Sequence, residues 1–353
     1  MKHITNSLAG LSLAAALTAG SPVTAQQNLT AETASPGNSP QVSILHLAEV
    51  ANAAGIANLQ VREGQTLTNS VLNVAQGRTD ISAMPLILGF LLSKGRGPYS
   101  KQGPEKGAEL ASNLRALYPY NAGAYGLIAL ESKGITNWAD LKGKTVFNGP
   151  PRGAALVNAR QAIFLAAGLK DGVDYTGHQV NWGQLAGLLV DGSMDAFVYP
   201  LTFPSARVTT MQAAGNVAIV STPKNIFESD AYQKVFNAPG NVPIIVKWED
   251  MGYGDGNGVR LISEDATFRG LGTAFTDVVS KDMPFDTAKA LVGEYIKTMD
   301  ALKAKSPYMG NVGLGDLDPR DSGFCGINPL KYHPGAVAAW EEAGYKVPDC
   351  AKE

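Results

Sequence analysis

A nine-residue pattern that occurs twice most constrains what this chain of 353 residues can fold into. The copies GRTDISAMP (77–85) and GSMDAFVYP (192–200) share a glycine, an aspartate and a proline, each recurring 115 positions later (192 − 77, 195 − 80 and 200 − 85). Glycine can end a helix in the left-handed conformation, aspartate can bond the following turn, and proline ends a strand. We therefore expect two lobes on one plan, each with a strand that ends at a cleft, where open α/β sheets bind ligands.

The segments around both copies alternate between helix and strand patterns. Apolar residues recur at helical spacing over 41–55, 71–77, 154–168 and 285–303, and short apolar runs occupy 56–61, 81–84, 114–118, 125–130 and 144–147. Thr68, Asn69 and Ser70 offer an N-cap to the second of these helices. Such alternation predicts an α/β fold with βαβ units and mainly parallel sheets.

The first 25 residues have the pattern of a secretory signal peptide. Lys2 precedes an apolar run over 8–19, and small residues at Val23 and Ala25 fit a cleavage site after Ala25. The apolar run has about 12 residues, whereas a membrane-spanning helix needs about 20, so an uncleaved anchor is the less favoured alternative. We expect the exported chain to reside in the periplasm and not to be embedded in the membrane.

The rest of the chain divides where its patterns change. We predict a first part of lobe 1 over 26–122, lobe 2 over 123–240, and over 241–353 a return crossing, the second part of lobe 1 and C-terminal helices. The return crossing is expected at 242–246. Because lobe 2 is inserted into lobe 1, the chain crosses between the lobes twice, which predicts a two-strand hinge.

Charge and cysteine content limit the partners and the compartment. The chain has 29 Lys and Arg against 31 Asp and Glu, a formal charge of −2, so it lacks the basic excess that nucleic-acid binding requires. Two cysteines, Cys325 and Cys350, lie in the exported part, where oxidation favours a disulfide over two buried thiols. We also expect a monomer.

Three segments resemble the TAXI proteins, the solute receptors of one branch of the TRAP transporters. They are TNSVLNVAQGRTD (68–80), ITNWADLKGK (135–144), and YHPGA (332–336) with the following Trp340 and EAG (342–344). The resemblance implies a type II periplasmic binding protein fold, two lobes closing on a small solute, and delivery to a TRAP membrane permease. Two loops depart from the family pattern, at 35–40 and 149–153, so the resemblance does not identify the solute.

We expect the ligand to be held at helix and strand ends beside the cleft. Free N–H groups and the partial positive charge of a helix N-terminus suit a carboxylate. Arg152 is the preferred anchor, because a guanidinium holds a carboxylate through two parallel bonds; the alternative is a solvated loop arginine. Asn69 and Ser70 can instead be helix caps only, and the aromatic residues can be core. The predicted ligand-binding residues are Asn38, Ser39, Thr68, Asn69, Ser70, Pro85, Tyr125, Asn148, Arg152, Tyr199 and Thr202.

The sequence offers little support for an enzyme. His46, His178 and His333 lie far apart and lack metal-ligand spacing, and no Gly-x-Ser-x-Gly elbow occurs. The glycine-rich run at 252–258 lacks the Lys-Ser/Thr ending of a phosphate loop, and the aspartates at 316–321 lack the glycine of a calcium loop. We therefore predict no catalytic residue, no metal and no cofactor.

The function predicted from the sequence is capture of a small anionic solute, a carboxylate or an amino-acid-like compound, for a TRAP permease. Three alternatives stay open: an ABC-type receptor for a sulfonate or pyrimidine precursor, a ligand sensor that presents its solute to a membrane kinase, and, less favoured, a secreted hydrolase. Sodium coupling of uptake separates the TRAP receptor from the ATP-dependent ABC receptor, and turnover of the bound compound identifies a hydrolase.

Overall fold

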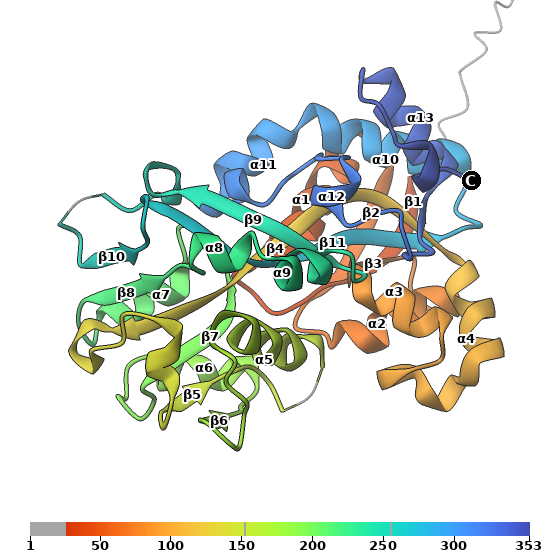
Figure 1. Ribbon diagram of the computed structural model, residues 1–353. Coiled ribbons are helices and arrows are strands. Elements are labelled where there is room, and N and C mark those ends of the chain that lie inside the picture. Colours follow the sequence, from red (N-terminus) through yellow and green to blue (C-terminus); the bar gives the residue numbers. More distant parts are fainter. Residues whose placement is uncertain (1–25, 152, 255) are drawn as a thin grey trace, which may run out of the picture.

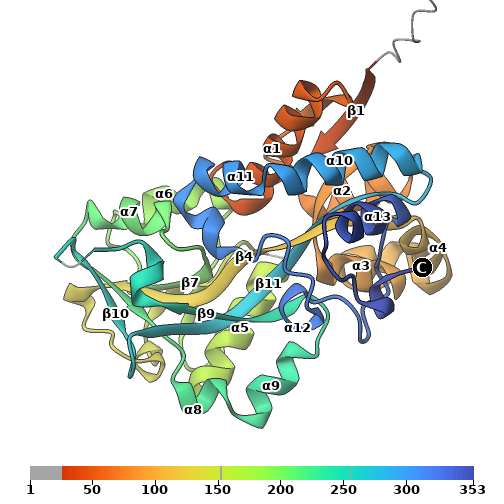
Figure 2. The same cartoon turned by 90° about the horizontal axis from the view of Figure 1, so that it is seen from above.

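The computed structural model describes residues 26–151, 153–254 and 256–353. The predicted signal peptide and Arg152 lie outside these residues. Figures 1 and 2 show the chain as one long twisted sheet with helices packed on its faces. The main strand order is β2-β1-β3-β11-β4-β7-β5-β6, and β8, β9, β10 and β12 pair beside this path.

The strands are short except for two. They are β1 Gln27–Glu32, β2 Ala57–Arg62, β3 Ile81–Pro85, β4 Leu114–Leu130, β5 Thr145–Phe147, β6 Thr176–His178, β7 Ala196–Leu201, β8 Val217–Val220, β9 Asn241–Lys247, β10 Val259–Ile262, β11 Thr267–Ser280 and β12 Lys331–Tyr332. The helices are α1 Ser39–Ala53, α2 Leu67–Ala75, α3 Leu86–Ser93, α4 Gly103–Ser112, α5 Ala154–Ala167, α6 Leu185–Leu188, α7 Ala206–Gln212, α8 Lys224–Phe227, α9 Asp230–Phe236, α10 Phe285–Lys297, α11 Met299–Lys305, α12 Pro319–Ser322 and α13 Pro334–Glu342.

The repeated pattern belongs to two copies of one supersecondary unit. The first unit runs β1-α1-β2-α2-β3 and the second β5-α5-β6-α6-β7. In each unit the first strand lies between the other two and pairs with both in parallel. Helices α1 and α5 begin at Ser39 and Ala154, which again are 115 positions apart (154 − 39). The repeat therefore extends well beyond the nine residues that revealed it.

The repeated aspartates join neighbouring strands, and do not bond the following turn as we predicted. The carboxylate of Asp80 accepts a hydrogen bond from the backbone N–H of Thr30 at 2.7 Å, and that of Asp195 accepts one from the N–H of Thr145 at 2.9 Å. Each backbone N–H of the two aspartates is bonded in turn to the carbonyl of the same threonine. Both aspartates thus fasten the amino end of the third strand of a unit to the first strand.

Two long antiparallel strands, β4 and β11, connect the two units. The segments 114–118 and 125–130, predicted as separate strands, belong to the single strand β4, because pairing with β11 continues on both sides of a bulge at residues 122–123. Strand β11 pairs with β3 and β4 pairs with β7, both antiparallel. In each unit the second strand is followed by the first and then the third, and an antiparallel strand comes next. That strand is β11 beside the first unit and β4 beside the second. Such an arrangement is that of a type II periplasmic binding protein, and the predicted fold class is confirmed.

The hydrophobic core is divided into separate clusters, and the division lies in the middle of β4 and β11, where these strands pass from one unit to the other. One cluster takes its residues from 31–120 and 274–351, together with Val242. Two others, on opposite faces of the sheet formed by β4 to β7, take theirs from residues between 124 and 271. Strand β9 pairs with β11, and its Val246 packs in one of the latter clusters. Val242 of β9 packs in the first cluster, so β9, like β4 and β11, has residues in both core regions. The predicted lobe boundaries and the return crossing at 242–246 stay predictions.

The C-terminal segment packs beside the first unit. Helix α10 contacts both α13 and α1 (Figures 1 and 2). The helix predicted over 285–303 is broken at Thr298, whose hydroxyl donates to the carbonyl of Glu294 at 2.6 Å and lies 2.8 Å from Nε2 of His46. The predicted disulfide between Cys325 and Cys350 is present, and it ties the end of the chain to the segment before β12.

Candidate functional site

The carboxyl ends of the parallel strands define where a ligand site belongs in this fold. In the first unit the strands end at Glu32, Arg62 and Pro85, and in the second at Phe147, His178 and Leu201. Loops that follow these ends lead into the helices of each unit. Open α/β sheets bind their ligands outside the carboxyl ends of strands, so we assign the candidate site to these loops and to the middle of β4 and β11.

On the side of the first unit, Asn38 and Ser39 have their side chains bonded within the protein. Oδ1 of Asn38 accepts a hydrogen bond from the backbone N–H of Gln41 at 3.1 Å and caps α1. The hydroxyl of buried Ser39 donates to the carbonyl of Asn121, in the middle of β4, at 2.7 Å. The two residues thus position the start of α1 against the connecting strand.

The segment Thr68–Ser70 lies inside α2 rather than capping it. Thr66 is the N-cap residue, so all three residues belong to the first turns of the helix. Asn69 is exposed, and the carbonyl of Thr68 accepts a hydrogen bond from the hydroxyl of Tyr99 at 3.0 Å. Ser70 is fully buried, and its hydroxyl has no hydrogen-bond partner among the described residues. Of the three, Ser70 alone combines burial with an unused polar atom.

Pro85 and Tyr125 lie where the strands meet. Pro85 is the last residue of β3 and pairs with Phe275 of β11. Tyr125 is buried in the core cluster on the α5 face of the second unit, and burial raises the pKa of its hydroxyl. Beside it the amide of Asn158, on α5, lies 3.4 Å from the hydroxyl of Thr273 on β11. This contact joins α5 to the connecting strand.

Asn148, which follows β5, has both ends of its amide bonded within the protein. Its Nδ2 donates to Asp171 at 3.0 Å, and its Oδ1 accepts from Nε2 of Gln179 at 2.7 Å. Asp171 also pairs with Arg160 of α5 at 2.7 Å. Asn148 therefore orders the loops after β5 and β6, and these two bonds use one N–H and one lone pair of its amide.

Tyr199, on β7, is buried, and Thr202, just after the strand, is half-buried. The hydroxyl of Tyr199 has no hydrogen-bond partner among the described residues, and burial raises its pKa. Its ring packs against Phe147 at the end of β5, with centroids 6.1 Å apart.

Sequence reasoning missed Arg207, which contacts the rings of both Tyr199 and Trp182, and it missed Trp182 itself. The guanidinium carbon of Arg207, in the first turn of α7, lies 4.7 Å from the ring centroid of Trp182 and 5.1 Å from that of Tyr199. Trp182 follows β6, and α7 follows β7, so both residues lie at the carboxyl edge of the second unit. The signal that could have found Arg207 is its place just after the second repeated strand.

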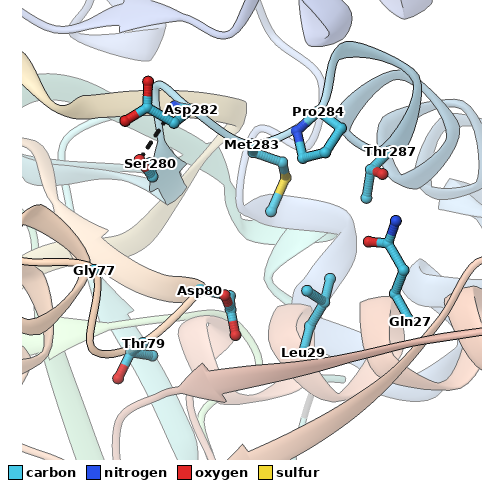
Figure 3. Close-up of a pocket in the computed structure, with 10 residues that line it drawn as sticks. All are labelled: Gln27, Leu29, Gly77, Thr79, Asp80, Ser280, Asp282, Met283, Pro284 and Thr287. Atoms are coloured by element: carbon cyan, nitrogen blue, oxygen red, sulfur yellow. Dashed lines mark hydrogen bonds between the residues drawn. The ribbon is translucent and has the colours of Figure 1, made fainter.

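Two pockets lie elsewhere. One of about 180 Å³ is at the amino edge of β1 and β3, lined by residues that include Asp80, Gln27 and Asp282 (Figure 3). The other, of about 330 Å³, is lined by Pro243, Ile245, Arg320 and Asp321, beside β9 and α12. Neither includes a predicted ligand-binding residue.

Across residues 26–353, with 152 and 255 left aside, no helix has the length and apolar character needed to cross a membrane. Nor do three or more His, Cys, Asp or Glu side chains gather there in a way that could hold a metal ion.

A sequence model of the NMT1-like family matches residues 33–238, more than half of the chain, and the protein belongs to this family. The match includes two of the segments that resemble TAXI receptors, 68–80 and 135–144, and confirms the resemblance at the level of the family; the segment 332–344 lies beyond it. No curated protein matches the sequence.

Similar solved structures include three solute-binding proteins. DctP7 of Bordetella pertussis, an extracytoplasmic solute receptor binding pyroglutamic acid, is 13% identical, with a TM-score of 0.43 over 90% of this chain and 93% of its own. The aliphatic sulphonate binding protein SsuA of Escherichia coli is 12% identical, with a TM-score of 0.46 over 93% and 90%. A TRAP solute-binding protein of Ralstonia eutropha with bound (S)-2-acetolactate is 14% identical, with a TM-score of 0.43 over 92% and 87%.

Proposed function

We propose that this protein is a periplasmic solute-binding receptor that captures a small organic anion and delivers it to a TRAP-type membrane permease. The observation that carries the proposal is the duplicated unit. Two matched β-α-β-α-β units flank two connecting strands, and both have their strand carboxyl ends at the loops where this fold binds ligands. The core cluster of the first unit is separate from the two clusters of the second, which suits two lobes that move relative to each other.

The anionic character of the solute is supported by the helix starts at this edge. Helices α1 and α5 are 15 and 14 residues long, and both begin after the carboxyl end of a parallel strand. The start of α5 has no side-chain cap, so its free N–H groups and the partial positive charge there favour an anion. The start of α1 contributes mainly its partial positive charge, because Asn38 caps it and Pro40 has no N–H. Closure of the lobes would exclude water and strengthen each polar contact with the ligand. The predicted leader is consistent with a periplasmic location.

The test begins with protein isolated from the periplasm of the producing cell. Native mass spectrometry identifies a co-purified solute, and calorimetry measures its affinity for the stripped protein. Small-angle scattering with and without saturating solute should show a smaller radius of gyration in the bound form. An unchanged radius of gyration with the solute bound contradicts closure of two lobes.

Reconstitution with the membrane partner distinguishes the transporter classes. Uptake into vesicles that depends on a sodium gradient supports the TRAP assignment, and uptake that depends on ATP supports the ABC-type alternative. Conversion of the solute to a product by the purified protein would contradict the receptor function itself.

A further inference from the structure

We propose that Arg207 is the residue that binds the charged head of the solute, with the hydroxyl of Tyr199 as a second contact and the ring of Trp182 as a wall of the site. The head group would be a carboxylate or a sulfonate. This inference rests on the proposed function and assigns its specificity to three residues of the second unit.

Arg207 differs from the other arginines that the structure describes. It is half-buried, and among the described residues no carboxylate lies within ion-pair distance of it and no hydrogen bond from its guanidinium is formed. The others are exposed at the surface or paired with an acid. The paired arginines are Arg62 with Glu32, Arg115 with Glu353, Arg160 with Asp171, Arg260 with Glu131 and Arg269 with Asp265. The exposed arginines are Arg78, Arg96 and Arg320.

A partly desolvated guanidinium without an acid is costly unless another group compensates the charge. Burial lowers the pKa of Arg207, in keeping with this cost. The rings of Trp182 and Tyr199 offset part of it through their negative faces. A guanidinium over a ring still has its five N–H donors, which lie in its plane. Arg207 is therefore held in place while its donors remain available for an oxyanion.

The hydroxyl of Tyr199 supplies a second, independent sign of a missing ligand. The residue is 1% exposed, yet its hydroxyl has no partner among the described residues. Buried hydroxyl groups are normally hydrogen-bonded, because a buried donor without an acceptor has lost its bond to water without replacing it. An oxyanion bound to Arg207 would lie beside this hydroxyl and could accept its hydrogen bond.

The aromatic rings beside Arg207 indicate what the uncharged part of the ligand is like. Trp182 and Phe147 pack edge to face, with ring centroids 6.1 Å apart, and present apolar surface beside the guanidinium. Among the described residues, Arg207 is the cation that lies over these rings, and no carboxylate pairs with it. We therefore expect a singly charged head on a small, largely apolar or planar body, and weak binding of neutral amides of the same shape.

The probes are matched sets of small monocarboxylates, sulfonates and the amides of the same acids. Thermal-shift screening finds the acids that bind, and calorimetry measures their dissociation constants with the wild type and with R207K, R207A, Y199F and R152A. R320Q is the control, because Arg320 is an exposed arginine on α12. We expect a loss of 10- to 100-fold for R207A, since a hydrogen bond to a charged group contributes about 1.5–3 kcal/mol. Smaller losses are expected for R207K and Y199F, and none for R320Q.

A stability measurement separates binding from a structural role. Without ligand, R207M should unfold at the same temperature as the wild type or higher, because it removes a buried charge that lacks an acid. R269M, which breaks an ion pair with Asp265 at 2.6 Å, should unfold at a lower temperature. Destabilisation by R207M equal to that by R269M contradicts the proposal.

The outcomes distinguish this inference from the proposed function. If the wild type binds an acid and folded R207A binds it equally well, the inference is wrong and the receptor function stands; loss of binding in R152A alone would then make Arg152 the anchor. If the wild type binds no acid in the set, carries no solute from the periplasm and shows no change in scattering, the receptor function itself is contradicted.

Discussion

At the scale of single residues, a buried acid on β11 is surrounded by hydroxyl groups. Asp277 is fully buried and accepts hydrogen bonds from Tyr118 and Tyr120 of β4, both at 2.7 Å, and from Ser43 of α1 at 3.2 Å. Burial raises its pKa to about 6, although these three bonds favour the charged form. The cluster lies where α1 packs on both connecting strands, so its protonation state affects the stability of that junction.

We predict that this acid makes the protein less stable as the pH rises from about 4 to about 6. In that range the folded state holds a proton that the unfolded state has released, so stability falls with pH. The difference corresponds to about 3 kcal/mol, at 1.36 kcal/mol per pH unit. Urea denaturation of wild type and D277N across this range measures it. Subtracting the two profiles removes groups common to both, such as His46, whose pKa burial lowers to about 4. Parallel profiles would contradict the prediction.

The two repeated aspartates should contribute alike to stability. D80A and D195A each remove the acceptor of a backbone N–H on a neighbouring strand, at Thr30 and Thr145. We expect each to lower the free energy of unfolding by about 1–3 kcal/mol. Chemical denaturation measures both, and D300A, on the exposed surface of α11, is the control. If only one of the two variants lost stability, the two aspartates would not contribute equally to the free energy of unfolding.

The sequence predicted features that depend on neighbouring residues and missed those that depend on contacts between residues far apart in the chain. The repeat identified Asp80 and Asp195 but not their partners, because these lie 50 positions away on another strand. Asn148 was placed at the correct strand end, yet its use by Asp171 and Gln179 depends on loops that no local pattern specifies. Arg207 was missed because its lack of an acid is a property of the folded chain.

At the scale of elements, local signals were sufficient where a turn residue marks the boundary. Helix α5 ends before Gly168 and helix α1 before Gly55, both in the left-handed conformation, as predicted. The continuity of β4 was not predictable, because Asn121, Ala122 and Gly123 interrupt the apolar run as a turn would, and Gly123 does have a positive φ of +81°. The register with β11 shifts at this residue, and pairing continues on both sides of it, so β4 remains one strand.

Gly123 should therefore tolerate no side chain. An added Cβ would meet the carbonyl oxygen of Leu201 at 2.0 Å, and the positive φ is unfavourable for alanine. We expect G123A to lower the free energy of unfolding by about 2–4 kcal/mol. G293A, in the middle of α10 with open space around the added carbon, should raise it by about 0.5–1 kcal/mol. Thermal and urea denaturation of both variants provide the comparison, and equal stability of the two would refute it.

At the scale of the whole molecule, the disulfide closes a loop over residues 325–350, which holds β12 and α13. Chain entropy predicts that removing it costs roughly 3 kcal/mol. We expect the double variant C325S/C350S to unfold at a lower denaturant concentration than the wild type. A reducing agent should lower the midpoint of the wild type and leave that of the variant unchanged; an effect on the variant would point to another cause.

The hydrogen bonds that Asp80 and Asp195 accept from the neighbouring strand have a consequence for how such receptors diversify. They secure the sheet at one rim, whereas the loops that precede α1 and α5 emerge from the opposite rim. With the solute bound at that opposite rim, as we propose, recognition and assembly would belong to separate parts of the chain. Exchange of those loops, in evolution or by design, would then change the solute that is bound while the framework still assembles correctly.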